Sequence, residues 1–117
     1  MKILITGGSG TIGKAFIGEF PKHEYFNISR NEKFLTDLMR EHPNATNFIG
    51  NIEDKEFLFR VFKDVKPDVV IHAAAMKHIN IAEENPIQAC QSNVIGSINV
   101  INASVMVDVP ITIGIST

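Results

Sequence analysis

Residues 2–13 read KILITGGSGTIG, in which a short apolar run leads directly into a glycine-rich turn. The run Lys2–Thr6 predicts a strand, and the helical spacing of apolar residues in Thr11–Phe20 predicts a helix after the turn. A strand, a glycine loop and a helix in this order are typical of the first β-α-β unit of a dinucleotide-binding domain. This stretch therefore predicts both a fold class and a class of ligand.

The rest of the chain continues the alternation of strands and helices. Such alternation implies right-handed crossovers and a parallel sheet with helices on both faces. We therefore predict an α/β fold with a doubly wound parallel sheet of five strands. The predicted strands are Lys2–Thr6, Glu24–Ser29, Asn47–Ile49, Asp68–His72 and Ile111–Ile115, and the predicted helices are Thr11–Phe20, Glu32–Arg40, Lys55–Phe62 and about Pro86–Val107.

The spacing of the glycines suits a bound pyrophosphate. Such a group must approach the backbone N–H groups at the start of a helix, where unsatisfied donors and the helix dipole favour negative charge. Side chains at Gly7, Gly10 or Gly13 would obstruct the turn, the phosphates or the packing of the helix on the strand. The alternative interpretation is an ordinary tight turn. Because the loop lacks the Lys-Ser/Thr ending of a mononucleotide P-loop, a dinucleotide is favoured over the substrate of a kinase or NTPase.

The end of the second predicted strand indicates which dinucleotide is bound. An NAD site commonly places a carboxylate there, about 20 residues after the glycine loop, to accept a hydrogen bond from the ribose 2′-OH. This chain has Ser29-Arg30-Asn31 instead, and its first carboxylate is Glu32. A hydroxyl, a guanidinium and an amide offer donors to a 2′-phosphate, so NADP is favoured over NAD. The alternative for Arg30 is a solvated loop charge.

Composition restricts the function further. The 117 residues suffice for one domain, residues 1–117, and a net charge of −2 gives no basic field for nucleic acid. The lone Cys90 excludes an internal disulfide, no apolar run approaches the roughly 20 residues of a membrane span, and MKILITGG is not a secretory signal. His72 and His78 have poor spacing for a metal site. We therefore expect each histidine to be hydrogen-bonded or exposed rather than bound to a metal. We also expect a cytoplasmic protein.

Several motifs resemble a known superfamily. TGGSGTIG at residues 6–13 and HAAA at residues 72–75 resemble the extended short-chain dehydrogenase/reductases. The longer segment HAAAMKH, residues 72–78, is similar to the nucleotide-sugar 4,6-dehydratases of bacterial polysaccharide biosynthesis, especially the inverting UDP-N-acetylglucosamine dehydratases. Further matches are Ala82-Glu83, Asn85-Pro86, Ser92–Gly96 and Ser116-Thr117. The resemblance implies an NADP-dependent enzyme with a UDP-sugar substrate.

The resemblance also implies roles for individual residues. It places Gly7, Ser9, Gly10, Thr11, Ile12 and Gly13 at the pyrophosphate, Ser29 and Arg30 at the adenosine ribose phosphate, Asn51 and Ile52 at the adenine edge, Ala73, Ala74 and Ala75 under the nicotinamide ribose, Lys77 near the cofactor or the sugar nucleotide, and Asn93 near the active-site backbone. The family usually has Asp at position 51, whereas Asn51 can accept a hydrogen bond but adds no charge. A solvent-facing helix position is the alternative for Asn93.

The catalytic residue implied by the resemblance is Thr117, whose hydroxyl would hydrogen-bond the C4 oxygen of the sugar. In the family an Asp-Lys pair and a Tyr-x-x-x-Lys element follow, and the tyrosine accepts the C4 hydroxyl proton. The only tyrosine here, Tyr25, has no lysine four residues later. We therefore expect the chain to be the amino-terminal part of a larger enzyme, unable to turn over sugar nucleotides alone.

Two other functions remain open. One is a non-catalytic dinucleotide-binding module, and the other is an epimerase or reductase of the same superfamily, against which the segment Met76-Lys77-His78 argues. An incomplete sheet would also expose a strand edge and apolar helix faces. We therefore expect self-association, and the resemblance implies a homo-oligomer.

Overall fold

The computed structural model describes residues 1–7, 11–30, 32–73, 87 and 94–115. In these ranges, five strands form one parallel sheet in the order β3-β2-β1-β4-β5. The strands are β1 (Lys2–Thr6), β2 (Glu24–Ser29), β3 (Thr46–Ile49), β4 (Val69–His72) and β5 (Ile111–Gly114). The predicted five-stranded parallel sheet is confirmed, and no predicted strand end moves by more than one residue.

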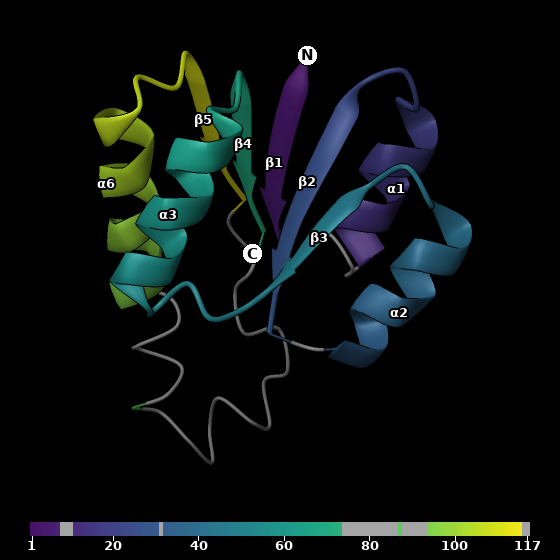
Figure 1. The fold of residues 1–117 in the computed structure, drawn as a ribbon, viewed down its shortest axis with the longest axis horizontal. Coiled ribbons are helices and arrows are strands. Elements are labelled where there is room, and N and C mark those ends of the chain that lie inside the picture. Colours follow the sequence, from purple (N-terminus) through teal and green to yellow (C-terminus); the bar gives the residue numbers. More distant parts are fainter. Residues whose placement is uncertain (8–10, 31, 74–86, 88–93, 116–117) are drawn as a thin grey trace.

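Helices cover both faces of this sheet. Figure 1 shows α1 and α2 on one face and α3 and α6 on the other. Their bounds are Thr11–Glu19 for α1, Glu32–Glu41 for α2, Lys55–Val65 for α3 and Gly96–Met106 for α6. The doubly wound arrangement is therefore confirmed. The predicted start of the last helix, at about Pro86, lies outside the described residues.

Helix α3 is longer than its predicted end at Phe62, and local interactions explain both of its ends. Asp54 caps the first turn, where its Oδ1 accepts a hydrogen bond from the Phe57 N–H at 3.2 Å. At the other end Lys66 adopts a left-handed conformation, with φ 50° and ψ 64°, and donates its N–H to the Phe62 carbonyl at 2.8 Å. Val65 is buried and extends the apolar face by another turn, so the helix continues to it.

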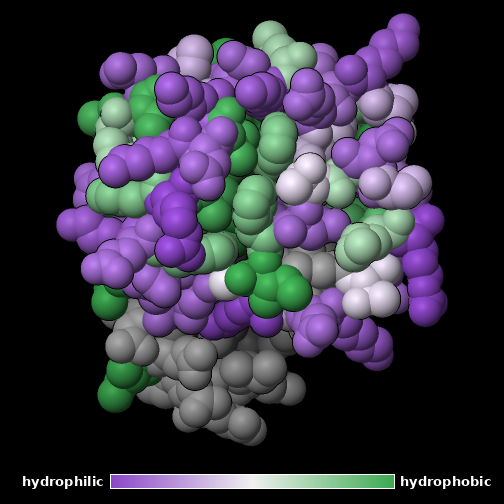
Figure 2. Space-filling view, in the orientation of Figure 1, coloured by the Kyte–Doolittle hydropathy of each residue, from purple (hydrophilic) through white to green (hydrophobic). Residues whose placement is uncertain are grey.

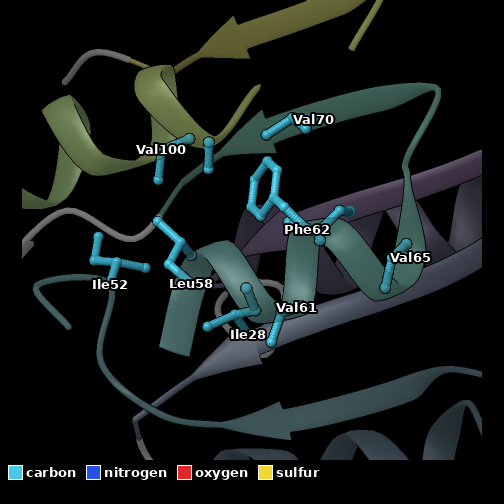
Figure 3. Close-up of a cluster of buried hydrophobic side chains, with 10 residues drawn as sticks. Ile28, Ile52, Leu58, Val61, Phe62, Val65, Val70 and Val100 are labelled. Atoms are coloured by element: carbon cyan, nitrogen blue, oxygen red, sulfur yellow. The ribbon is translucent and has the colours of Figure 1, made fainter. Parts of the chain in front are cut away.

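Among the described residues the hydrophobic core forms two clusters, one on each face of the sheet. The cluster between α1, α2 and the sheet includes Ile3, Ile5 and Leu38. The larger cluster lies under α3 and α6, and in Figure 3 Phe62 points from α3 toward Val70 of β4. Because successive strand residues point to opposite faces, β1 contributes to both clusters. The central strands are therefore buried on both sides, as their apolar runs predict.

Helix α6 turns its small and polar side to the core and its large apolar side chains outward. Its buried residues are Gly96, Asn99, Val100, Ala103 and Ser104, whereas Ile98, Ile101 and Val105 are 50–71% exposed. The neighbouring β5 is an edge strand of the sheet, and all four of its residues are exposed. A groove of about 430 Å³ lies between the two elements and is lined by Ile101, Ser104, Val105, Asp108, Val109 and Thr112. An apolar surface therefore remains uncovered at this end of the sheet.

Figure 2 shows the opposite end of the sheet to be mostly polar on its surface. Hydrophilic side chains cover the outer sides of α2 and α3, and hydrophobic side chains reach the surface along the seam between α3 and β2–β3. Phe26, Phe48 and Phe57 are partly buried and pack against the larger core cluster. In the described ranges the helices are too short or too polar to cross a bilayer.

Candidate functional site

The candidate site lies at the carboxyl edge of the sheet. Because the strands are parallel, β1, β2, β3 and β4 all end at this edge. Along the chain β2 and β3 follow β1 on one side, while β4 pairs with β1 on the other side, so the strand order reverses next to β1. Ligands of open α/β sheets bind at such a reversal. The predicted residues that follow these four strand ends are therefore brought together.

Gly7 makes the turn that leaves β1. Its φ of 76° lies in the left-handed region, which strains any residue with a Cβ, and its N–H donates to the Ile28 carbonyl at 2.9 Å. Helix α1 then begins at Thr11, with Ile12 and the buried Gly13 in its first turn. N–H groups in the first turn of a helix have no partner within the helix, so they can donate to an anion at this edge. The geometry of Gly7 therefore agrees with the predicted glycine loop.

The ends of β2 and β3 are joined next to this loop. Ser29 is the last residue of β2, and its carbonyl accepts a hydrogen bond from the Gly50 N–H at 3.0 Å. Arg30 follows and is exposed, so its guanidinium is accessible to a ligand at the edge. The hydrogen bond between Gly50 and Ser29 therefore places Arg30 beside the turn after β3.

Residues 50–54 form a compact turn between β3 and α3. The Asn51 side-chain Oδ1 accepts the Glu53 N–H at 3.0 Å, and the Asn51 carbonyl accepts the Asp54 N–H at 2.9 Å. The Asn51 side chain thus orders its own turn, although an amide oxygen has a second lone pair for a ligand. The Ile52 side chain is 7% exposed and packs in the core, so its side chain serves packing at this edge.

A polar network ties β1, β4 and α6 together at the same edge. His72 Nδ1 lies 2.7 Å from Thr6 Oγ1, and His72 Nε2 lies 2.9 Å from Ser97 Oγ. Ala73 donates its N–H to the Thr6 carbonyl at 3.0 Å and to Thr6 Oγ1 at 3.2 Å. Burial lowers the pKa of the His72 imidazole from its ordinary value of 6.5. The expected hydrogen-bonded role of His72 is thus confirmed, and the network fixes the start of the alanine segment.

Several predicted site residues lie outside the described part of the chain. These are Ser9, Gly10, Ala74, Ala75, Lys77, Asn93 and Thr117. The predicted site residues that the structure does describe at the carboxyl edge are Gly7, Thr11, Ile12, Gly13, Ser29, Arg30, Asn51, Ile52 and Ala73. They lie at or after the ends of β1, β2, β3 and β4.

Sequence reasoning missed three residues that organise this edge. Thr6 and Asn99 are buried, and Ser97 is half-buried beside His72. Asn99 Nδ2 donates hydrogen bonds to the carbonyls of Ile52 at 2.9 Å and Glu53 at 3.2 Å. Helical spacing does not show which face of α6 meets the sheet, so the sequence offered no signal that would have singled out Ser97 or Asn99.

Comparison with known proteins identifies the family of this fold and site. Residues 3–117 match the family described as polysaccharide biosynthesis protein. The chain belongs to this family. Membership in the polysaccharide biosynthesis family agrees with the resemblance to the extended short-chain dehydrogenase/reductases, which is therefore confirmed.

Relatives of this family member include sugar-nucleotide enzymes. The chain is 41% identical over 107 residues to a UDP-N-acetylglucosamine 4,6-dehydratase (inverting) from Campylobacter jejuni. The matched region covers 86% of the chain and 31% of that protein. It also matches a Thermotoga maritima UDP-glucose 4-epimerase with UDP-glucose, with a TM-score of 0.88, 28% identity, and coverage of 100% of the chain and 38% of the epimerase.

A third relative carries a dinucleotide. The chain matches the Bordetella bronchiseptica enzyme WbmG in complex with NAD, with a TM-score of 0.87, 28% identity, and coverage of 97% of the chain and 36% of that protein. The polysaccharide biosynthesis family member thus spans about a third of the length of its relatives. The part that it spans is the NAD(P)-binding portion of the nucleotide-sugar dehydratase and epimerase family.

Proposed function

We propose that residues 1–117 form the cofactor-binding domain of an NADP-dependent nucleotide-sugar 4,6-dehydratase of the UDP-N-acetylglucosamine type, acting in polysaccharide or glycan biosynthesis. The observation that carries this proposal is the left-handed Gly7 at the strand-order reversal, directly before helix α1. The dehydratase from Campylobacter jejuni, at 41% identity, supports the reaction class. The substrate-binding part belongs to the remaining two thirds of such proteins.

The residues of this edge suit an NADP molecule laid across it. The glycine loop, from Gly7 to Gly13, would hold the pyrophosphate, while Ser29 and Arg30 would hold the adenosine 2′-phosphate. The turn after β3 would lie along the adenine, and the alanine segment from Ala73 would lie under the nicotinamide ribose. The absence of a carboxylate at positions 29–31 is the specific reason for NADP over NAD.

In the proposed reaction the chain binds and orients the cofactor and the sugar, and it excludes water. NADP, when bound, supplies reversible hydride transfer. Thr6 and His72 hold the backbone of Ala73, which keeps the small-residue segment close to the sheet. Thr117 would donate or accept a hydrogen bond at the C4 oxygen of the sugar and so orient it. These residues would thus position a bound cofactor and the C4 oxygen of the sugar for a 4,6-dehydration.

An epimerase is the second candidate, favoured by the match to the Thermotoga maritima UDP-glucose 4-epimerase, which covers 100% of the chain and 38% of the epimerase. Both reactions begin with oxidation of the sugar and use the same cofactor edge. The higher identity to the Campylobacter jejuni dehydratase, 41% against 28%, favours the dehydratase.

Calorimetric titration of the chain with NADP⁺ and NAD⁺ in parallel tests the cofactor. We expect saturable binding that favours NADP⁺, and Arg30→Ala should weaken NADP⁺ by about tenfold or more because a charge-assisted hydrogen bond is lost. The matched control is Arg40→Ala, which removes an exposed arginine from the last turn of α2. Tighter binding of NAD⁺ would contradict the NADP assignment, and no heat with either dinucleotide would contradict the cofactor site.

We also propose that the chain forms homo-oligomers through the uncovered surface of α6 and β5. Ile98, Ile101 and Val105 lie there with Ile111 and Ile113, which are 49% and 47% exposed. Light scattering should give a mass above the 12.9 kDa of one chain, and Ile101→Lys should shift it toward that value. A wild-type chain of 12.9 kDa at every concentration tested would rule out this association.

A further inference from the structure

The strongest unassigned feature is the side chain of Asn99. It is 7% exposed, and its single amide nitrogen donates to two successive carbonyls, those of Ile52 at 2.9 Å and Glu53 at 3.2 Å. An amide NH₂ carries two hydrogens, so one side chain satisfies both oxygens at once. The two carbonyls are thereby held against a helix that is 46–47 residues away in the sequence.

Close packing at Gly96 supports the same contact. Gly96 lies one turn before Asn99 on the buried face of α6. A Cβ at Gly96 would lie 2.5 Å from Cδ1 of Ile52, so the helix approaches the turn more closely than a side chain would permit. Two independent contacts, one polar and one apolar, thus join α6 to residues 50–54.

The location of the turn at residues 50–54 indicates which part of a ligand its contact with α6 would affect. The turn lies at the carboxyl edge and is tied to the end of β2 by the hydrogen bond from the Gly50 N–H to the Ser29 carbonyl. In dinucleotide-binding sheets the end of β2 meets the adenosine ribose. The turn after the neighbouring β3 therefore borders the adenosine half of a dinucleotide, while the alanine segment after β4 lies on the other side of β1.

We propose that Asn99 is a positioning residue that holds the β3–α3 turn in place for the adenosine half of the cofactor. Asn99 itself does not touch the cofactor, and its effect passes through the Ile52 and Glu53 backbone. The proposal rests on the proposed function, because it assigns the turn to the adenosine half of a dinucleotide.

The test compares Asn99→Asp and Asn99→Ala with Asn102→Asp and Asn102→Ala. Asn102 is an exposed asparagine on the same helix, so these substitutions control for helix propensity and net charge. Asn99→Asp replaces donors with a carboxylate facing two carbonyl oxygens, and Asn99→Ala removes the donors alone. The alanine variant keeps the proposal testable where the carboxylate prevents folding.

The ligands are adenosine 2′,5′-bisphosphate and nicotinamide mononucleotide, each titrated by calorimetry. We expect the Asn99 variants to bind the bisphosphate about tenfold more weakly and the mononucleotide within twofold of wild type. We also expect faster hydrogen exchange at the Glu53 and Asp54 amides, with the Asn102 variants unchanged. A general loss of stability would not separate the two ligands in this way.

Two failures are distinguishable. If wild type binds the bisphosphate and the Asn99 and Asn102 variants bind it equally, the positioning role is overturned. If wild type binds neither the bisphosphate nor NADP⁺, the proposed function is overturned and the cofactor role of Asn99 with it. In that second case the exchange rates still report whether Asn99 holds the turn.

Discussion

Replacing Phe62 with alanine is expected to lower the free energy of unfolding by about 3–5 kcal/mol, the cost typical of a large aromatic residue lost from a core. Phe62 is fully buried, and it points from α3 into the cluster that includes Leu4, Val70 and Val100 (Figure 3). Because small domains are stable by only about 5–15 kcal/mol, this one change removes much of the total. Urea unfolding followed by far-UV circular dichroism measures the effect.

Phe59→Ala is the matched control for that substitution. Phe59 lies on the same helix and packs on the same cluster while only partly buried, with Lys55 Nζ 5.4 Å from its ring centroid. We expect this variant to lose about 1 kcal/mol, since its ring gives up less buried area and an exposed cation–π contact. Equal losses for the two variants would show that Phe62 does not have the central place in the core that its burial indicates.

Replacing His72 with phenylalanine is expected to destabilise the chain by about 1–3 kcal/mol, because hydrogen bonds to buried polar groups are lost. The imidazole lies 2.7 Å from Thr6 Oγ1 and 2.9 Å from Ser97 Oγ, and a phenyl ring of similar size offers neither oxygen a partner. The variant should also weaken cofactor binding, because Thr6 holds the Ala73 N–H. Chemical denaturation at pH 8 measures the stability difference.

The same variant should change how stability depends on pH. Burial lowers the folded-state pKa of His72 below the ordinary 6.5 of the unfolded chain. Between the two values the unfolded chain binds more protons, so stability from His72 is complete above about 6.5 and declines as pH falls through the folded pKa. The wild type should therefore lose stability more steeply than His72→Phe as the pH falls below about 6.5.

His42→Gln provides the control for this pH series. His42 follows α2, outside the network of Thr6, His72 and Ser97. We expect His42→Gln to keep the pH dependence of the wild type, while His72→Phe flattens it. A pH dependence unchanged in His72→Phe would mean that the buried imidazole does not account for the loss of stability.

The elements that sequence reasoning predicted most reliably are those encoded by nearby residues. The apolar runs of β1, β2 and β4 and the glycine turn after β1 depend on neighbours in the chain, so their pattern is readable directly. Gly7 shows why, because its φ of 76° is a local requirement that selects glycine. The end of α3 was predicted too early, since its left-handed cap at Lys66 leaves no such mark in the residue type.

The side of α6 that meets the sheet was not readable in this way. Periodicity shows that Ile98, Ile101 and Val105 share a stripe, but not whether that stripe faces the core. The structure turns the stripe outward and packs Gly96 and Ala103 inward. Small residues permit the helix to approach the sheet closely. The face of α6 that packs on the sheet is therefore the one with small residues, and not the one with the largest apolar side chains.

The sequence by itself determined the parallel α/β fold, the glycine turn and the edge of the sheet at which a dinucleotide would bind. These features depend on local conformation and on the order of the elements. Only the tertiary structure decided how that edge is held. Thr6 meets His72 across 66 positions, and Asn99 meets Ile52 across 47. These hydrogen bonds join groups that come together only after the sheet and helices have packed. The residues near each group in the sequence therefore do not indicate its partner.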